Sequence, residues 1–134
     1  MRTAARETLF KIIFASQFTE ETDGVFKQSL YAKEKLDEKD TAYCDDVLGI
    51  IRVHKDEFTE ILNSRSRLFP EARLFPADRS VLFIALAEIL YRDDIPDTVS
   101  VNEAANIASK FSSEKSASFV SGILAEVIRE KTGV

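Results

Sequence analysis

Basic side chains at the start of the chain have the chemistry to bind phosphate groups. Arg2 and Arg6 are four residues apart, which is close to one helical turn, and Lys11 follows them. Guanidinium groups at this spacing can reach successive phosphate oxygens of a nucleic acid, each through a fork of donors. The alternative, which charge alone favours, is a solvated helix end without a ligand.

A second group of residues near the C-terminus has chemistry for phosphates and bases. Ser112 and Ser113 form a predicted helix-capping turn with free backbone amides, a neutral site for a phosphate. Lys110 and Lys115 flank that turn. Phe119 lies outside the core stripe of the following helix, where it could stack on an unpaired base. The alternatives are ordinary capping by the serines and a phenylalanine that fills a crevice against the preceding helix.

An aromatic row on the first predicted helix points to a protein interface. Phe10, Phe14 and Phe18 recur at every fourth position, about 100° around the helix from the predicted core stripe. Such a row suits an anchor for another protein, and Asp78 could accept an arginine from the same partner. We expect Phe10 to pack inside the domain and the other two to face the partner. The alternative is that the whole row packs internally and that Asp78 only caps its helix.

The sequence lacks recognisable catalytic and metal-binding motifs. Cys44 is the only cysteine and His54 the only histidine, which excludes an internal disulfide and a Cys/His zinc site. We interpret both residues as packed or half-exposed side chains. Glycine-rich phosphate loops, G-x-S-x-G, H-E-x-x-H and carboxylate clusters at metal-ligand spacing are all missing. We therefore expect no enzymatic activity, no cofactor and no metal.

The charge balance limits how the chain could bind nucleic acid. Its 134 residues include 18 basic and 23 acidic side chains, a formal net charge of -5 at pH 7. This balance argues against binding through bulk positive charge. Residues 1–18 hold three bases against one acid, whereas residues 31–60 hold nine acids against five bases. We expect RNA to avoid the acidic stretch and to bind only at local basic sites.

The elements that must position these side chains are helices. Apolar residues recur at spacings of three and four, and no segment shows a sustained two-residue period. The predicted fold class is all-α, a compact bundle of about six to seven helices in one domain over residues 1–134. The N-terminal helices (about 1–64) and the C-terminal helices (about 68–132) are expected to pack as one unit. The expected helices cover about 3–18, 25–32, 40–63, 76–90, 101–111 and 114–131.

Local signals refine this bundle. Phe69-Pro70 and Phe75-Pro76 predict a break, because the residue before a proline avoids helical backbone angles. The second proline suits the first turn of a helix that is apolar on nearly all sides except at Glu88, and we expect this helix to be central and buried. Ser100 and Glu103 fit a capping box. The third helix is expected to be a scaffold element about 35 Å long.

The apolar runs are too short to span a membrane. The longest uninterrupted run, residues 81–87, has seven residues, against roughly 18 to 20 for a membrane-spanning helix. The N-terminus has no apolar stretch with a small-residue cleavage site after it. We expect a cytoplasmic protein that is neither membrane-spanning nor secreted.

Several segments resemble the NusB family in content, order and spacing. The N-terminal match is Ala5-Arg6-Glu7 followed by Leu9, Ile13 and Phe14. The C-terminal match comprises DRSVL (78–82), AEIL (87–90), DIP (94–96), VNEA (101–104), ASKF (108–111) and KSASFVSGIL (115–124). The resemblance covers about residues 2–18 and 78–127. It is strong in the second half of the chain and weak from 19 to 75.

The resemblance implies an all-helical, non-enzymatic bacterial factor of transcription antitermination. Such factors pair with NusE, a ribosomal small-subunit protein. The pair binds the boxA element of nascent ribosomal RNA transcripts as single-stranded RNA in the RNA polymerase antitermination complex. For this chain the resemblance favours RNA contacts at Arg2, Arg6, Lys110, Ser112, Ser113, Lys115 and Phe119. It favours NusE contacts at Phe14, Phe18 and Asp78.

One departure from the family pattern concerns the strength of RNA binding. Family members often carry a denser arginine cluster at the first helix, where this chain has the uncharged Thr3, Ala4 and Ala5. A chain of net charge -5 also repels RNA at long range. We therefore expect NusE, as a basic partner, to raise the RNA affinity substantially.

Two other functions fit parts of the sequence. The chain could be a protein-interaction module without RNA binding, such as a homodimer that buries Phe14 and Phe18 against a second copy. It could also be an RNA-modifying enzyme, because the same helical domain occurs attached to ribosomal RNA methyltransferases. That activity is not expected here, since a chain ending at Val134 leaves no room for a cofactor-binding catalytic domain.

Overall fold

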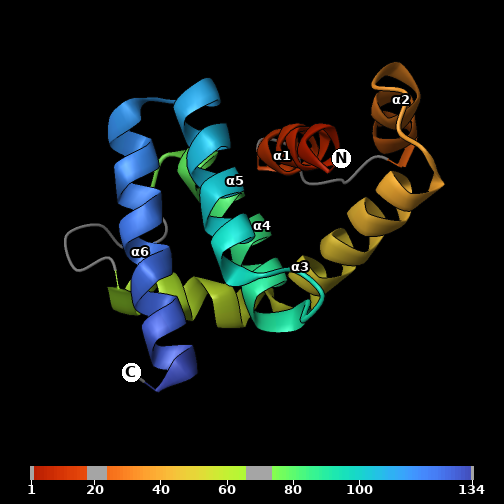
Figure 1. Cartoon of the computed structure of the whole chain (residues 1–134). Helices are drawn as coiled ribbons and strands as arrows, with labels where there is room; N and C mark the ends of the chain where they lie inside the picture. The colour runs from red at the N-terminus through yellow and green to blue at the C-terminus, as the bar shows by residue number, and fades with distance from the viewer. Residues whose placement is uncertain (1, 18–23, 66–73, 134) are drawn as a thin grey trace.

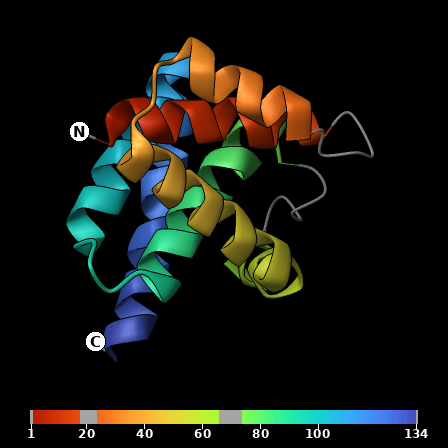
Figure 2. The ribbon, with the colours of Figure 1, turned by 90° about the vertical axis from the view of Figure 1, so that its right-hand side faces the viewer.

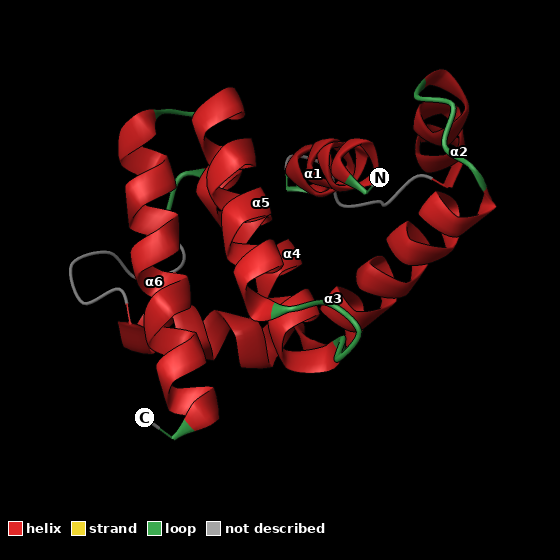
Figure 3. Cartoon of the chain, viewed as in Figure 1, coloured by secondary structure: helices red, strands yellow, loops and turns green. Residues whose placement is uncertain are grey.

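The fold consists of helices throughout the part of the chain that the structure describes. The computed structural model describes residues 2–17, 24–65 and 74–133. Its helices are α1 (Thr3–Ser16), α2 (Gly24–Lys33), α3 (Glu38–Arg65), α4 (Pro76–Tyr91), α5 (Asp97–Phe111) and α6 (Glu114–Thr132). Within these ranges there is no strand (Figure 3). The predicted all-α class is therefore confirmed, with six helices in the described ranges.

Helix α4 is the centre of the bundle. Each of its residues from Ser80 to Ile89 is buried, and the helix contacts α1, α3, α5 and α6 (Figure 1). Pro76 occupies the first helical position, where its fixed φ suits the helix and its missing N–H costs nothing. The prediction of a buried central helix that starts at this proline is confirmed.

Helix α3 is kinked, which corrects the expectation of one straight scaffold helix. His54 has non-helical backbone angles (φ -108°, ψ 16°) and divides the helix into two arms that run in different directions (Figure 1). The His54 ring stacks on Tyr91, the last residue of α4, with 3.9 Å between ring centroids. The kink lets both arms bury apolar side chains, namely Tyr43, Cys44, Val47 and Ile51 before it and Phe58 and Leu62 after it.

Helices α1 and α2 lie side by side, with α1 between α2 and the helices α4, α5 and α6 (Figure 1 and Figure 2). The predicted core stripe of α1 is buried, including Ala5, Leu9, Ile12 and Ile13. By contrast, Tyr31 is the single buried side chain of α2. Its hydroxyl donates a hydrogen bond of 2.8 Å to Asp45 of α3. Helix α2 is thus held by the buried Tyr31 ring, by Leu30 at the edge of the core and by the bond to Asp45.

Helices α5 and α6 form an antiparallel pair joined at Ser112 and Ser113 (Figure 1). The capping-box prediction for α5 is wrong, because the helix starts at Asp97 and its N-cap residue is Pro96. Pro96 fixes the entry angle of the chain four residues before the predicted cap Ser100. Ser100 therefore lies inside the helix, where its hydroxyl donates a hydrogen bond of 2.8 Å to Glu88.

Two further expectations were a break at Phe69-Pro70 and the lack of a membrane-spanning helix. The predicted break at Phe69-Pro70 lies outside the described residues. As for the membrane, every helix in the described ranges is too short or too polar to cross one.

Candidate nucleic-acid and partner interface

Helices α1 and α5 pack together and carry three of the predicted basic residues, Arg2 just before α1, Arg6 in α1 and Lys110 in α5. The contacts that join them include Thr3 Oγ1 to Glu103 Oε1 (2.9 Å), Lys110 Nζ to Glu7 Oε1 (2.7 Å) and the Phe10 ring to the Phe111 ring (4.8 Å). We call this line of contacts the α1–α5 seam. Because it runs from the start of α1 to the end of α5, Arg2 and the Ser112 turn lie at its two ends.

Arg6 does not offer its guanidinium to solvent, which corrects the expectation of an exposed phosphate ligand. It is buried and donates Nε to Glu88 Oε2 (2.8 Å) and Nη2 to Glu88 Oε1 (3.1 Å). A third bond runs from Nη1 to Glu103 (3.3 Å). Burial lowers the pKa of Arg6, but the bond to Glu88 and the surrounding charges outweigh it and raise the pKa overall. Arg6 is therefore a charged internal cross-link.

Glu88 is the acceptor on which this cross-link converges. Its side chain is 1% exposed on the central helix α4. Besides Arg6 of α1, it accepts hydrogen bonds from Tyr43 Oη of α3 and Ser100 Oγ of α5. A buried carboxylate needs such partners, since an unpaired one is costly. The signal in the sequence was a lone acid in the otherwise apolar run from residue 81 to residue 90, but sequence reasoning gave it no role.

Arg2 lies at the first end of the seam and is partly exposed. Its guanidinium is 5.0 Å from the centroid of the Tyr43 ring and 3.7 Å from Asp94. The Arg92 guanidinium also lies over the Tyr43 ring, 5.3 Å from its centroid. The Tyr43 ring and the Asp94 carboxylate together hold this guanidinium in place. Arg2 is thus positioned at the surface, and its contact with RNA stays a prediction.

The Ser112–Ser113 turn at the other end of the seam is an N-terminal cap. Ser113 is the N-cap residue of α6 and accepts the backbone N–H of Ser116 at 3.1 Å, as predicted. The Ser112 hydroxyl lies 2.8 Å from the Ser116 hydroxyl. Both turn serines are exposed, as are Lys110 and Lys115 beside them. Capping accounts for Ser113, while phosphate binding at this turn stays a prediction.

Phe119 is half-buried and packs against the edge of the hydrophobic core. It is therefore neither part of the core stripe of α6 nor fully exposed. One part of the Phe119 ring fills a crevice at the edge of the core, and the other part is accessible for stacking. Base stacking at Phe119 stays a prediction.

The aromatic row of α1 divides as expected where it is described. Phe10 is buried and stacks on Phe111, which confirms its internal role. Phe14 stacks on Phe10 at 5.7 Å and is 36% exposed. Phe18 lies outside the described residues. Phe14 therefore continues the buried stack to the surface, where a partner could cover it.

Asp78 is buried, which corrects the expectation of an open carboxylate. It is 4% exposed in the first turn of α4, and its Oδ1 has no hydrogen-bond partner among the described residues. Burial raises the pKa of this carboxyl, and a hydrogen bond with Ser116 lowers it only in part. Asp78 does not cap its helix either, because Phe75 is the N-cap residue. Its contact with a partner stays a prediction.

Replacing Asp78 by asparagine should stabilise the protein at neutral pH. Its folded-state pKa is raised above the ordinary aspartate value of about 3.9, so the ionised carboxylate costs stability above that folded-state pKa. The gain of Asp78→Asn should shrink as the pH falls and wild-type Asp78 takes up its proton. Urea denaturation across a pH series measures this, with Asp93→Asn on the surface as the control. A gain that grows toward acid pH contradicts the assignment.

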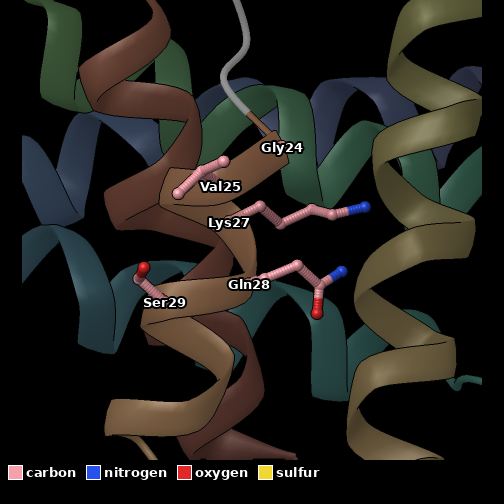
Figure 4. Close-up of a pocket in the computed structure, with 5 residues that line it drawn as sticks. All are labelled: Gly24, Val25, Lys27, Gln28 and Ser29. Atoms are coloured by element: carbon pink, nitrogen blue, oxygen red, sulfur yellow. The ribbon is translucent and has the colours of Figure 1, made fainter.

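Three further features bear on the chemistry of the chain: the Cys44 thiol, groups of metal-ligating side chains and the hollow along α2. Cys44 is buried, and burial raises the pKa of its thiol to about 12, which makes it a poor nucleophile. No group of three metal-ligating side chains occurs in residues 2–17, 24–65 or 74–133. An open hollow lies along α2, where Lys27 and Gln28 extend toward α3 (Figure 4). Its charged group, Lys27, is already paired with Asp45 at 3.1 Å.

Solved structures place this helix arrangement in a known class. NusB from T. maritima superimposes with a TM-score of 0.86 at 26% identity, covering 97% of this chain and 92% of that one. The structure titled "Crystal Structure of Antitermination Factors NusB and NusE in complex with dsRNA" gives 0.86 at 18% identity, with 96% of each chain covered. That second likeness shows the fold alone. The architecture is therefore that of the helical antitermination factors.

Sequence comparison specifies the family. The NusB family model matches residues 3–129, and the chain belongs to the NusB family. A protein of Natranaerobius thermophilus named "Transcription antitermination protein NusB" is 33% identical over 132 residues, covering 96% of this chain and 95% of that protein. A protein of the same name from Methylacidiphilum infernorum is 42% identical over 95 residues, which span 71% of this chain and 66% of its own length.

Proposed function

We propose that this chain is a non-enzymatic transcription antitermination factor that pairs with NusE and binds boxA-type single-stranded RNA in nascent ribosomal RNA transcripts. The observation that carries the proposal is the α1–α5 seam, which joins the basic start of α1 to the serine turn through the contact of Lys110 with Glu7 (2.7 Å). Membership of the NusB family supports the same function. The RNA polymerase antitermination complex is the assembly in which we expect the chain to act.

The proposed RNA surface follows the seam and its two ends. Its members are accessible groups that can meet phosphates or stack on a base, and they are Arg2, Lys110, Ser112, Ser113, Lys115 and Phe119. Arg6 is no longer among them, because its donors are bonded to Glu88 and Glu103. Arg6 instead positions α1, and through it Arg2, against α4 and α5.

The proposed NusE surface lies at the C-terminal half of α1 and the first turn of α4. Phe14 offers a partly exposed ring that is held by the buried Phe10 behind it. Asp78 Oδ1 is a buried acceptor that lacks a hydrogen-bond partner among the described residues. An arginine or lysine of a basic partner would donate a hydrogen bond to this oxygen. Such a bond is favourable because a buried carboxylate oxygen needs a donor. The two contacts together suit a basic partner with an apolar side chain.

Replacing Phe119 by alanine should weaken boxA RNA binding about tenfold, because stacking one base on an aromatic ring contributes roughly 1–3 kcal/mol. Fluorescence anisotropy with a labelled boxA RNA measures the change. Phe119→Leu is the matched variant, since leucine keeps the packing of the half-buried ring but cannot stack on a base. Phe26→Ala on α2, which removes an exposed aromatic side chain away from the seam, is the control.

The outcomes separate RNA binding from the rival interaction module. Loss of affinity in both Phe119 variants, with Phe26→Ala unchanged and all three proteins folded, supports the proposal. An unchanged affinity in both Phe119 variants removes Phe119 from the RNA surface. No binding of boxA RNA by the wild-type chain, with or without NusE, overturns the proposed function.

A further inference from the structure

An exposed aromatic residue at the start of α4 has no role in the fold. Phe75 is 71% exposed although it is the N-cap residue of a buried helix. Serine, threonine, aspartate and asparagine favour the N-cap because they accept a hydrogen bond there, which phenylalanine cannot do. Its backbone is fixed, since its carbonyl accepts the N–H of Arg79 at 3.0 Å and Pro76 follows it. Neither burial nor capping therefore accounts for the ring.

Gln17 fixes the end of α1 against the start of α4, which sets the surroundings of Phe75. The Gln17 Nε2 group donates to Pro76 O at 2.9 Å and lies 2.6 Å from Ser80 Oγ. Its Oε1 accepts Nη1 of Arg79 at 2.7 Å. In Figure 2 the start of α4 lies against the C-terminal half of α1. This junction holds the two helix ends at a defined distance.

Phe14 and Phe75 flank this junction. Phe14 precedes Gln17 by three residues, so the two side chains lie on one face of the α1 helix. Phe75 is bonded directly to Pro76, whose carbonyl receives the Gln17 amide. Asp78, whose Oδ1 has no hydrogen-bond partner in the described part of the chain, follows Phe75 by three residues in the first turn of α4. Phe14, Phe75 and Asp78 therefore each lie within three residues of a residue that forms this junction.

We propose that Phe75 is an anchor for the basic protein partner to which the proposed function assigns Phe14 and Asp78, and the inference rests on that function. The fitting partner segment carries an apolar side chain that covers Phe75 and Phe14, next to an arginine or lysine that reaches Asp78. The negative net charge of the chain, -5, attracts such a segment. The apolar contact holds it, because a large exposed aromatic loses solvent contact when covered.

The test is NusE binding to the full chain by isothermal titration calorimetry. Phe75→Ala should weaken binding about tenfold, as expected of an aromatic anchor, and Phe75→Leu should weaken it less. Neither variant should lower the denaturation midpoint, because the ring is largely in solvent. Val53→Ala is the matched control, since Val53 is 76% exposed and neighbours His54 near the other end of α4.

Salt separates the anchor from the ionic contact. Screening weakens a contact between opposite charges but leaves apolar burial largely intact. The affinity ratio of wild type to Phe75→Ala should therefore stay constant between about 0.1 and 0.5 M salt. The corresponding ratio for Asp78→Asn should fall over the same range.

Each result decides a different claim. If the wild-type chain does not bind NusE, the proposed function falls and this inference falls with it. If the wild-type chain binds NusE and Phe75→Ala binds within twofold of it, the inference is overturned while the proposed function stands. If Phe75→Ala abolishes concentration-dependent self-association and leaves NusE binding intact, the ring anchors a second copy and the inference is again overturned.

Discussion

Replacing Glu88 by alanine will lower the free energy of unfolding by about 3–5 kcal/mol, the typical cost of breaking a buried ion pair from one side. The carboxylate is the acceptor for Arg6, Tyr43 and Ser100, which come from three different helices. Its removal leaves the Arg6 guanidinium charged and buried, with Glu103 as its remaining acid partner among the residues that the structure describes. Urea denaturation followed by circular dichroism measures the loss.

A matched control exists on the surface of the same protein. Glu57 also accepts a hydrogen bond from a tyrosine hydroxyl, that of Tyr91 at 2.5 Å, but this pair is exposed. Glu57→Ala should therefore shift the denaturation midpoint only slightly, because water replaces the lost partner. The double variant Arg6→Met with Glu88→Leu should recover much of the stability, since an apolar pair needs no charge compensation. Equal losses in Glu57→Ala and Glu88→Ala contradict the role of the network.

The parts of the fold that were predicted correctly from the sequence depend on short-range patterns. Spacings of three and four predicted the helices, because one face of each helix must be buried. Pro76 located the start of α4 and Ser113 the start of α6, and both act within one helical turn. The NusB resemblance rested on local motifs in the same way and was confirmed by the family match over residues 3–129.

The parts that sequence reasoning missed depend on long-range pairing. Arg6 and Glu88 are 82 residues apart, and an arginine in the first turns of a helix has the same sequence pattern whether it meets water or a buried acid. The sequence around Ser100 fits a capping box, but in the structure its hydroxyl donates a hydrogen bond to Glu88 instead. Asp78 likewise matched an open first-turn acid, although it is buried and bonded to Ser116 of α6. In each case the tertiary partner, rather than the local pattern, decided the role.

The burial of Arg6 changes how the proposed RNA surface is understood. With Arg6 committed to Glu88, the first turns of α1 offer Arg2 as their accessible arginine, held over Tyr43 at 5.0 Å. Lys110 is accessible but is paired with Glu7. An exposed lysine that already has an acid neighbour attracts phosphate less than an isolated one. The structure therefore strengthens the expectation of weak RNA binding by the chain alone.

NusE should raise the boxA RNA affinity of this chain about a hundredfold at low salt, because a second RNA-binding protein in the same complex makes the second contact intramolecular. The net charge of -5 opposes RNA binding by the chain alone. Each phosphate neutralised on a single strand contributes roughly 0.7 to the slope of log affinity against log salt, so NusE should also steepen that slope. A titration of labelled boxA RNA across a salt series, with and without NusE, measures both quantities.

Charge variants and a second RNA show whether this gain uses the proposed surface. The double variant Lys110→Gln with Lys115→Gln should weaken RNA binding and reduce the salt slope both with and without NusE, because it removes phosphate contacts. Lys33→Gln, in the acidic half of the chain, should change neither. A scrambled RNA should bind less tightly than boxA to the pair. Equal affinity with and without NusE, or equal affinity for the two RNAs, contradicts an antitermination factor that reads boxA with its partner.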